Sequence, residues 1–191
     1  SDWSDGRASL LEMVQSAADR GWKYYGTADH SRAAAYASGL SIDQLHQQRV
    51  EIDQLRQQFP DLIILQGIES DILADGSLDY PDDVLAELDY VVASVHSNFS
   101  LAKQQQTERI EKALRNPYTT VWGHPTGRLL LKRDGYEMDM AHLLEVAAEE
   151  QVIVELNANP RRLDIDWRWG GRVQELGIDI GIHPDAHSVA G

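Results

Sequence analysis

The sequence predicts an α/β fold built on a parallel sheet, and two observations lead to that class. Short apolar runs rich in Val, Ile and Tyr recur roughly every thirty residues, as buried strands do. Segments with helical periodicity separate these runs, and this alternation is typical of parallel strands joined by helices that cover the sheet. A closed barrel and a doubly wound sheet both satisfy the pattern.

The individual elements follow in order along the chain. Strands are predicted at 22–30, 62–69, 90–96, 119–124, 152–160 and 178–187. Helices are predicted at 8–21, 41–59, 80–88, 101–115 and 138–151. Three helix boundaries carry residue signals, with Ser41 as an N-cap, Gly21 as a C-cap and Pro81 as a first-turn proline.

Length and composition limit the possible functions. The 191 residues, 42% of them hydrophobic, predict a single domain over 1–191. The net charge of -14 opposes nonspecific attachment of the whole surface to nucleic acid, so any nucleic acid must be held locally. Without cysteine, a metal ion must be bound through imidazole and carboxylate. No stretch resembles a membrane span or a signal peptide, and a cytoplasmic location is expected.

The functional signal is the position of ligand-type side chains relative to the strands. His30, Glu69, His96, His124 and the pair Asp185 and His187 each stand at or just beyond the C-terminal end of a different apolar run. In parallel α/β folds these strand ends point to one face. We therefore expect these side chains to meet at a metal site.

The other histidines receive different interpretations. His46 and His142 fall within predicted helices and are assigned to solvated helix faces. His183 lies two residues before Asp185, and its simplest interpretation is a hydrogen-bonded residue at a strand end. A ligand at the same rim is the alternative for His183.

Several motifs, in this order, resemble the PHP family, the polymerase and histidinol phosphatase domains. The likeness covers nearly the whole chain and is closest to the C-terminal PHP domain of bacterial X-family DNA polymerases. The motifs are "SDG" at 4–6, "TADHS" at 27–31, the run "GIESDILADGSLDYPDDVLAELDYVVASVHSNF" at 67–99, "GHPTGRLL" at 123–130, "ELNANPRRLD" at 155–164 and "DAHS" at 185–188.

The resemblance implies a distorted (β/α)7 TIM-like barrel with two to three divalent ions, Zn, Mn or Fe, at its C-terminal rim. It implies that Glu69 bridges two ions, that His96 and His124 complete the second site, and that Asp185 belongs to the first. The third site would be formed by Asp5, His30 and His187. Glu69, His96 and Asp185 would act in catalysis through metal-bound water, since such ions lower the pKa of a bridging water and neutralise phosphoryl oxygens.

Two departures from the family pattern concern the first site. The family begins with an H-x-H pair at the end of a first strand, and neither precedes "WSDG" in this sequence. We therefore expect the chain to be a fragment of a longer polypeptide, with its first strand missing and an upstream polymerase domain as partner. The second departure is that His183 and Pro184 stand where relatives have small polar residues.

The resulting prediction is a metal-dependent phosphoesterase, acting as a 3'-5' exonuclease or phosphodiesterase on DNA 3' ends during DNA repair. Arg128 and Arg161, with Arg162 beside it, are candidates for phosphate binding because arginine binds phosphate oxygens in a bidentate manner. One alternative is a small-molecule phosphomonoesterase similar to histidinol phosphatase, which the acidic surface favours. The other is a noncatalytic structural module of a polymerase.

Overall fold

The computed structural model describes residues 1–190, which divide into two compact units. The first unit contains Ser1–Glu69, Tyr80–Val91 and the C-terminal segment from Ala186. The second unit contains Ser70–Asp79 and Val92–Asp185. The prediction of one domain over 1–191 is not tested by this division and stays a prediction.

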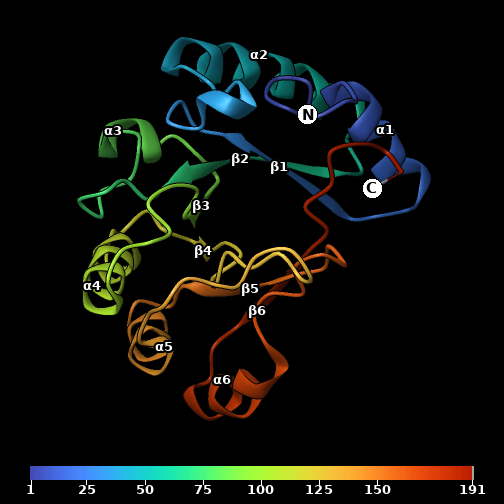
Figure 1. Cartoon of the computed structure of the whole chain (residues 1–191). Helices are drawn as coiled ribbons and strands as arrows, with labels where there is room; N and C mark the ends of the chain where they lie inside the picture. The colour runs from blue at the N-terminus through green and yellow to red at the C-terminus, as the bar shows by residue number, and fades with distance from the viewer. Residues whose placement is uncertain (191) are drawn as a thin grey trace. The chain divides into compact units, whose positions relative to one another are not determined.

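Strands and helices alternate along both units (Figure 1). The first unit holds α1 (Leu10–Asp19), β1 (Tyr24–His30), η1 (Ala35–Ala37), α2 (Ile42–Gln58), most of β2 (Ile63–Asp71), α3 (Asp82–Leu85) and the start of β3 (Tyr90–Ser94). The second unit holds the rest of β2 and β3, then α4 (Lys103–Leu114), β4 (Val121–Trp122), α5 (Met140–Glu149), β5 (Ile153–Asn157), η2 (Trp167–Trp169), α6 (Gly170–Leu176) and β6 (Ile180–His183).

In the first unit, two helices pack along a parallel pair of strands (Figure 1). The pairing of β1 with β2 runs in register to the last pair, His30 with Glu69. The apolar faces of α1 and α2 form a core with the start of β2, made of Leu10, Val14, Ala17, Ile52, Leu55, Leu62 and Ile64. Both helices begin with a capping box, at Ser9 and Ser41, which satisfies amide groups that would otherwise lack partners.

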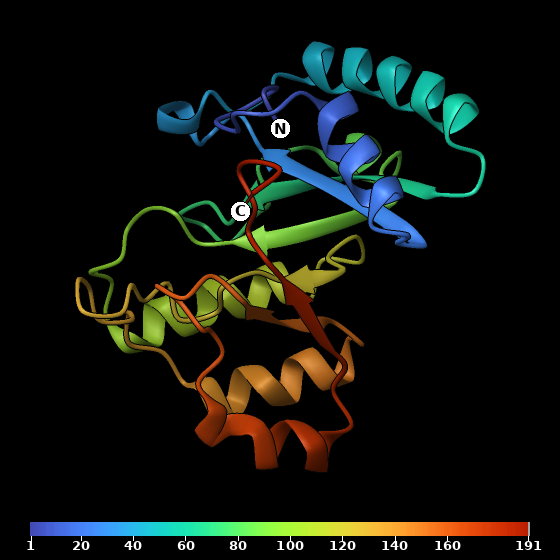
Figure 2. The ribbon, with the colours of Figure 1, turned by 90° about the vertical axis from the view of Figure 1, so that its right-hand side faces the viewer.

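In the second unit, β3, β4, β5 and β6 pair in parallel, each with the next along the chain. Helices α4, α5 and α6 follow one another beside these strands (Figure 2). Trp122 of β4 is fully buried, together with Ile110 and Leu114 of α4 and Leu143 and Leu144 of α5. This core fixes the strand ends from which the candidate ligands project.

The parallel α/β class predicted from the sequence is confirmed, and each predicted strand and helix is present. The bounds are shorter than predicted, except that β2 continues two residues beyond the predicted end, to Asp71. Among the described residues, α6 is an additional helix that the sequence reading left out. The barrel of seven repeats and the missing first strand stay predictions.

Three local predictions need correction. The strands β1 and β6 are not buried throughout, because they are edge strands, and Tyr24 and Ile182 are each 68% exposed. Pro81 is the N-cap of α3 rather than a residue of its first turn. Arg20 is the C-cap of α1, and Gly21 follows it at a φ of 71°, the left-handed conformation in which glycine ends a helix.

Within residues 1–190, none of the helices has the length and apolar character that crossing a membrane requires.

Candidate metal centre

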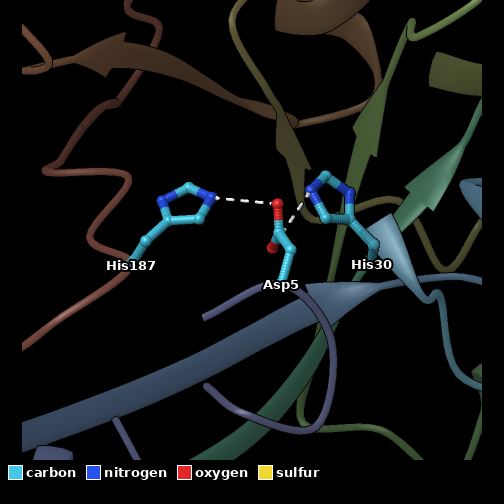
Figure 3. Close-up of side chains that lie close together, drawn as sticks. All are labelled: Asp5, His30 and His187. Atoms are coloured by element: carbon cyan, nitrogen blue, oxygen red, sulfur yellow. Dashed lines mark ion pairs between the residues drawn. The ribbon is translucent and has the colours of Figure 1, made fainter. Parts of the chain in front are cut away.

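The first unit brings three of the predicted ligands together (Figure 3). An Asp5 carboxylate oxygen lies 3.4 Å from His187 Nε2, and the other oxygen lies 3.9 Å from His30 Nε2. Each residue offers one ligand atom, and these atoms all lie within 4.8 Å of one another. The side chain of His30 is 12% exposed, whereas those of Asp5 and His187 are 37% and 45% exposed, so the group opens to solvent on one side.

Local hydrogen bonds place these three side chains. The buried carboxylate of Asp29, next to His30 in β1, accepts hydrogen bonds from Ser4 Oγ at 2.7 Å and from Gln48 Nε2 at 2.8 Å. The bond to Ser4 holds the loop that carries Asp5 against the end of β1. The amide of Arg7 donates to the carbonyl oxygen of His187 at 2.7 Å, which fixes the C-terminal segment to the same loop.

Glu69 extends this group within the first unit. It is the register partner of His30 at the end of β2, and its Oε2 lies 3.4 Å from His30 Nδ1. Glu69 is thus a fourth predicted ligand, next to His30 at the C-terminal ends of β1 and β2. Glu69 therefore lies beside His30, which belongs to the group with Asp5 and His187, and the role of these residues as metal ligands stays a prediction.

The second unit brings His96 and His124 together. Their Nε2 atoms are 3.2 Å apart, and the rings meet edge to face. On its other side, the His96 ring places Nδ1 2.5 Å from a carboxylate oxygen of Asp71. When His96 Nδ1–H donates to the Asp71 carboxylate, the lone pair lies on Nε2, on the side of His124, and this is the tautomer that a metal ligand requires.

Asp185 lies in a second polar group of the same unit. Its Oδ2 accepts from Asn157 Nδ2 at 3.2 Å and lies 3.3 Å from Arg162 Nε. Asn157 also donates to the buried carboxylate of Glu155, which accepts from the amide of His124 at 2.5 Å. Glu155 and Asn157 therefore connect the end of β5 to two predicted ligands.

His183 contacts Glu155, with its Nδ1 3.0 Å from Oε1. This position agrees with the interpretation of His183 as a hydrogen-bonded residue at a strand end. The helix histidines also lie where they were expected: His46 on α2 is 3.2 Å from a Glu87 oxygen, and His142 on α5 is 2.7 Å from a Glu111 oxygen.

The backbone is strained at two of the predicted ligands. His124 has a φ of 24° and Asp185 a φ of 55°, conformations that residues with a β-carbon rarely adopt. Such strain costs on the order of 1–3 kcal/mol per residue and is concentrated at functional sites. Nearby, Gly127 has a φ of 62°, and a β-carbon there would lie 2.6 Å from the Tyr136 ring, so this turn after His124 requires glycine.

The predicted phosphate-binding arginines lie in different surroundings. The Arg128 guanidinium donates to the carbonyl oxygens of Arg162 and Leu163 and lies 3.0 Å from an Asp166 oxygen, so it joins two loops of the second unit. Arg161 is exposed. Arg162 Nη1 is buried and, among the described residues, has no hydrogen-bond partner, and its Nε faces Asp185. Of these arginines, Arg162 is the one beside a predicted ligand.

Sequence reasoning missed the residues that orient the ligands, namely Asp29, Asp71, Glu155 and Arg109. Arg109 donates to the carbonyl oxygens of Ile72 and Ser97, which directly follow Asp71 and His96. One signal was available for two of them. Asp29 and Glu155 are charged residues inside apolar strand patterns, and a charge at such a position is buried only when it has partners. Arg109 falls in the middle of a polar helix and carries no comparable signal.

The ligand types in the first-unit group of Asp5, His30 and His187 and in the second-unit pair of His96 and His124 fit a divalent transition metal. Imidazole nitrogen and carboxylate oxygen together suit zinc, manganese or iron, whereas magnesium and calcium prefer oxygen alone. In the first unit, the ligand atoms of Asp5, His30 and His187 lie close enough to reach one ion.

Comparisons with known proteins identify relatives of the chain. It is 44% identical over 189 residues to the DNA polymerase/3'-5' exonuclease PolX of Bacillus subtilis, a match that covers 99% of this chain and 33% of PolX. It is 29% identical over 137 residues to a probable phosphatase of Caldanaerobacter subterraneus, covering 65% of this chain and 50% of that protein. No protein-family model matches the chain.

A solved structure shares the fold. The crystal structure of histidinol phosphate phosphatase from Lactococcus lactis, complexed with zinc, L-histidinol and phosphate, matches with a TM-score of 0.61 and 15% identity. The match covers 99% of this chain and 84% of that one. The chain thus spans about a third of PolX and half of the probable phosphatase. These relatives confirm the resemblance to the PHP family that the motifs predicted.

Proposed function

Because the chain is a homologue of PolX and of the probable phosphatases, a relationship consistent with a PHP domain, we propose that it is a metal-dependent phosphoesterase. The observation that carries this proposal is the group of Asp5, His30 and His187, whose ligand atoms lie within 4.8 Å of one another. Divalent ions bound there supply Lewis-acid activation of water and neutralisation of phosphoryl charge.

The roles of the chain's own residues follow from their contacts. In the first unit, Glu69 beside His30 provides a second carboxylate for the metal centre. In the second unit, the Asp71 carboxylate beside Nδ1 favours the His96 tautomer whose lone pair is on Nε2, the atom that would bind metal. We propose that His96, His124 and Asp185 of the second unit are metal ligands as well, as the family resemblance implied.

Phosphate recognition is assigned to Arg162 in place of Arg128. A buried guanidinium nitrogen without an acceptor costs about 1–3 kcal/mol, and a phosphate oxygen would satisfy Nη1 of Arg162. Asp185 orients the other side of the same guanidinium through Nε. Arg128 is instead occupied by backbone carbonyls and Asp166.

We propose a phosphodiester at a DNA 3' end as the substrate, with hydrolysis in the 3'-to-5' direction, because the relative with 44% identity is a DNA polymerase and 3'-5' exonuclease. An upstream polymerase domain in the same polypeptide and a role in DNA repair belong to this proposal. The match covers only a third of PolX, which leaves room in such a protein for a polymerase domain.

The second candidate is a small-molecule phosphomonoesterase. The similarity to the probable phosphatases favours this candidate. The net charge of -14 favours it too, because a small phosphate ester can bind without an extended positively charged surface. Histidinol phosphate and a single-stranded oligonucleotide, offered to the same preparation with Mn²⁺, distinguish the two candidates by their relative kcat/KM.

The test of the proposal itself uses matched histidine variants and bis(p-nitrophenyl) phosphate with Mn²⁺. His30→Ala removes a ligand and is expected to lower kcat/KM by about 100-fold or more. His46→Ala removes a histidine from the exposed face of α2 and is expected to leave activity unchanged. Equal activity of the two variants would refute the metal centre, and an inactive chain with less than one bound metal would favour a noncatalytic module.

A further inference from the structure

Two loops of the second unit lie side by side (Figure 2) and are joined by hydrogen bonds. The first loop, residues 127–133, follows His124 at the end of β4, and the second, residues 160–169, follows the end of β5. The amide of Leu130 donates to the carbonyl oxygen of Arg161, and Arg128 binds the second loop through Arg162 and Leu163. We call these two segments the paired loops.

The paired loops concentrate positive charge on an acidic chain. They hold six of its 17 Lys and Arg residues, whereas the chain as a whole has a net charge of -14. The only carboxylates of the paired loops, Asp164 and Asp166, do not offset the outer cations. Asp164 is fully buried and accepts from Thr126, and Asp166 is engaged by Arg128 and Arg168.

Three cations of the paired loops are exposed and, in the described part of the chain, have no carboxylate within ion-pair distance: Lys132, Arg133 and Arg161. Arg133 is held in place by the carbonyl oxygen of Gly127 and by the Phe99 ring, whose centroid lies 4.4 Å from Cζ. Exposed cations without an acidic partner are available to bind phosphate.

The paired loops also expose large apolar side chains. Trp167 is 85% exposed, and Leu131 at the tip of the first loop is 109% exposed. Leu131 and Leu163 also have φ values of 62° and 45°, so each pays a conformational cost to hold an apolar side chain in solvent. Exposed apolar groups next to cations are typical of surfaces that bind single-stranded nucleic acid, where bases stack on aromatic rings and cations follow the backbone.

We propose that the paired loops bind single-stranded nucleic acid, with Trp167 stacking on a base and Lys132, Arg133 and Arg161 contacting backbone phosphates. This inference rests on the proposed function for the choice of partner, and it adds where the strand lies in the second unit. The first loop begins three residues after His124, and Arg162 of the second contacts Asp185. A strand on the paired loops would therefore lead toward these two predicted ligands.

Fluorescence anisotropy of a labelled oligothymidylate, with the full chain and EDTA to prevent cleavage, tests the proposal. Three phosphate contacts predict a slope of log K against log salt of about -2, and loss of one contact weakens binding about fivefold at ~0.1 M salt. Lys132→Ala and Arg161→Ala are each expected to show that loss and a shallower slope. Trp167→Ala is expected to weaken binding about fivefold or more without changing the slope.

Two control variants match these changes elsewhere on the chain. Lys112→Ala removes the same charge from α4, where the side chain is 57% exposed beside Asp75, and Trp22→Ala removes a half-exposed tryptophan from the first unit. Wild-type affinity in the Lys132 and Trp167 variants, or equal losses in the controls, would overturn the proposal. Hydrolysis of bis(p-nitrophenyl) phosphate by the wild-type chain tests the proposed function separately, because binding in EDTA does not require catalysis.

Discussion

Arg109 of α4 provides the sharpest test of how the second unit holds its ligands. The residue is 3% exposed, and its guanidinium donates to the carbonyl oxygens of Leu73 at 2.8 Å and Ser97 at 2.9 Å, and also to that of Ile72. Ile72 directly follows Asp71, and Ser97 directly follows His96. One buried cation therefore ties together the two segments that carry the Asp71 and His96 pair.

The cost of removing this cation follows from its contacts. Burial lowers the pKa of the Arg109 guanidinium, but an arginine remains charged at neutral pH. Arg109→Met keeps much of the apolar stem and deletes hydrogen bonds to three carbonyl oxygens, one of them buried and two partly buried. Such a loss costs about 3–5 kcal/mol in the free energy of unfolding, which lowers the urea midpoint by at least about 1 M.

Urea unfolding followed by circular dichroism measures this effect, with Arg115→Met on the same helix as the control. Arg115 is exposed and pairs with surface carboxylates, so its loss is expected to change stability by less than about 1 kcal/mol. Zinc affinity of the folded Arg109→Met protein is expected to fall, since the Asp71 and His96 segments are no longer tied. A midpoint within error of the Arg115 variant would refute the reasoning.

The remaining predictions concern one ligand orienter, one core residue and one surface pair. Asp71→Asn should lower zinc affinity by about 10–100-fold in calorimetric titration, because His96 loses the carboxylate that fixes its tautomer; unchanged affinity would contradict this role. Trp122→Ala should destabilise the chain by about 3–5 kcal/mol in urea unfolding, since the side chain is fully buried; a loss under about 1 kcal/mol would contradict its place in the core. The hydrogen bond to Glu111 raises the pKa of His142, so its stabilisation is present below the unfolded pKa of about 6.5 and is lost as pH rises through the folded pKa. His142→Gln should therefore lower the urea midpoint more at about pH 5.5 than at about pH 9, and an equal effect at both would disprove the linkage.

The strand ends could be predicted from the sequence because burial and ligand chemistry are local signals. His30 and Glu69 each end an apolar run, and the parallel register of β1 and β2 makes them neighbours. Asp5 has no such signal, since "WSDG" is typical of an ordinary turn, and only the family resemblance indicated it. The bond from Ser4 to Asp29 that places Asp5 joins residues 25 positions apart, which no local pattern encodes.

The phosphate-binding arginines show where sequence reasoning ends. In the sequence, nothing distinguishes Arg128, Arg161 and Arg162, which are all arginines in two loops. Their roles depend on which carbonyl and carboxylate oxygens lie beside each of them in the folded loops. Arg128 is occupied by the second loop, whereas Arg162 turns one nitrogen toward Asp185 and buries another. Edge exposure of β1 and β6 was missed for a similar reason, since an apolar run does not show how many neighbours its strand has.

The central claim is that Asp5, His30 and His187 bind a divalent metal ion. Crystals of the chain grown with zinc or manganese, with anomalous diffraction data collected at the absorption edge of the metal, test it most directly. The account predicts an anomalous peak at about 2.0–2.2 Å from one oxygen of Asp5 and one nitrogen of each histidine. A well-phased map without a peak at these three side chains would contradict it.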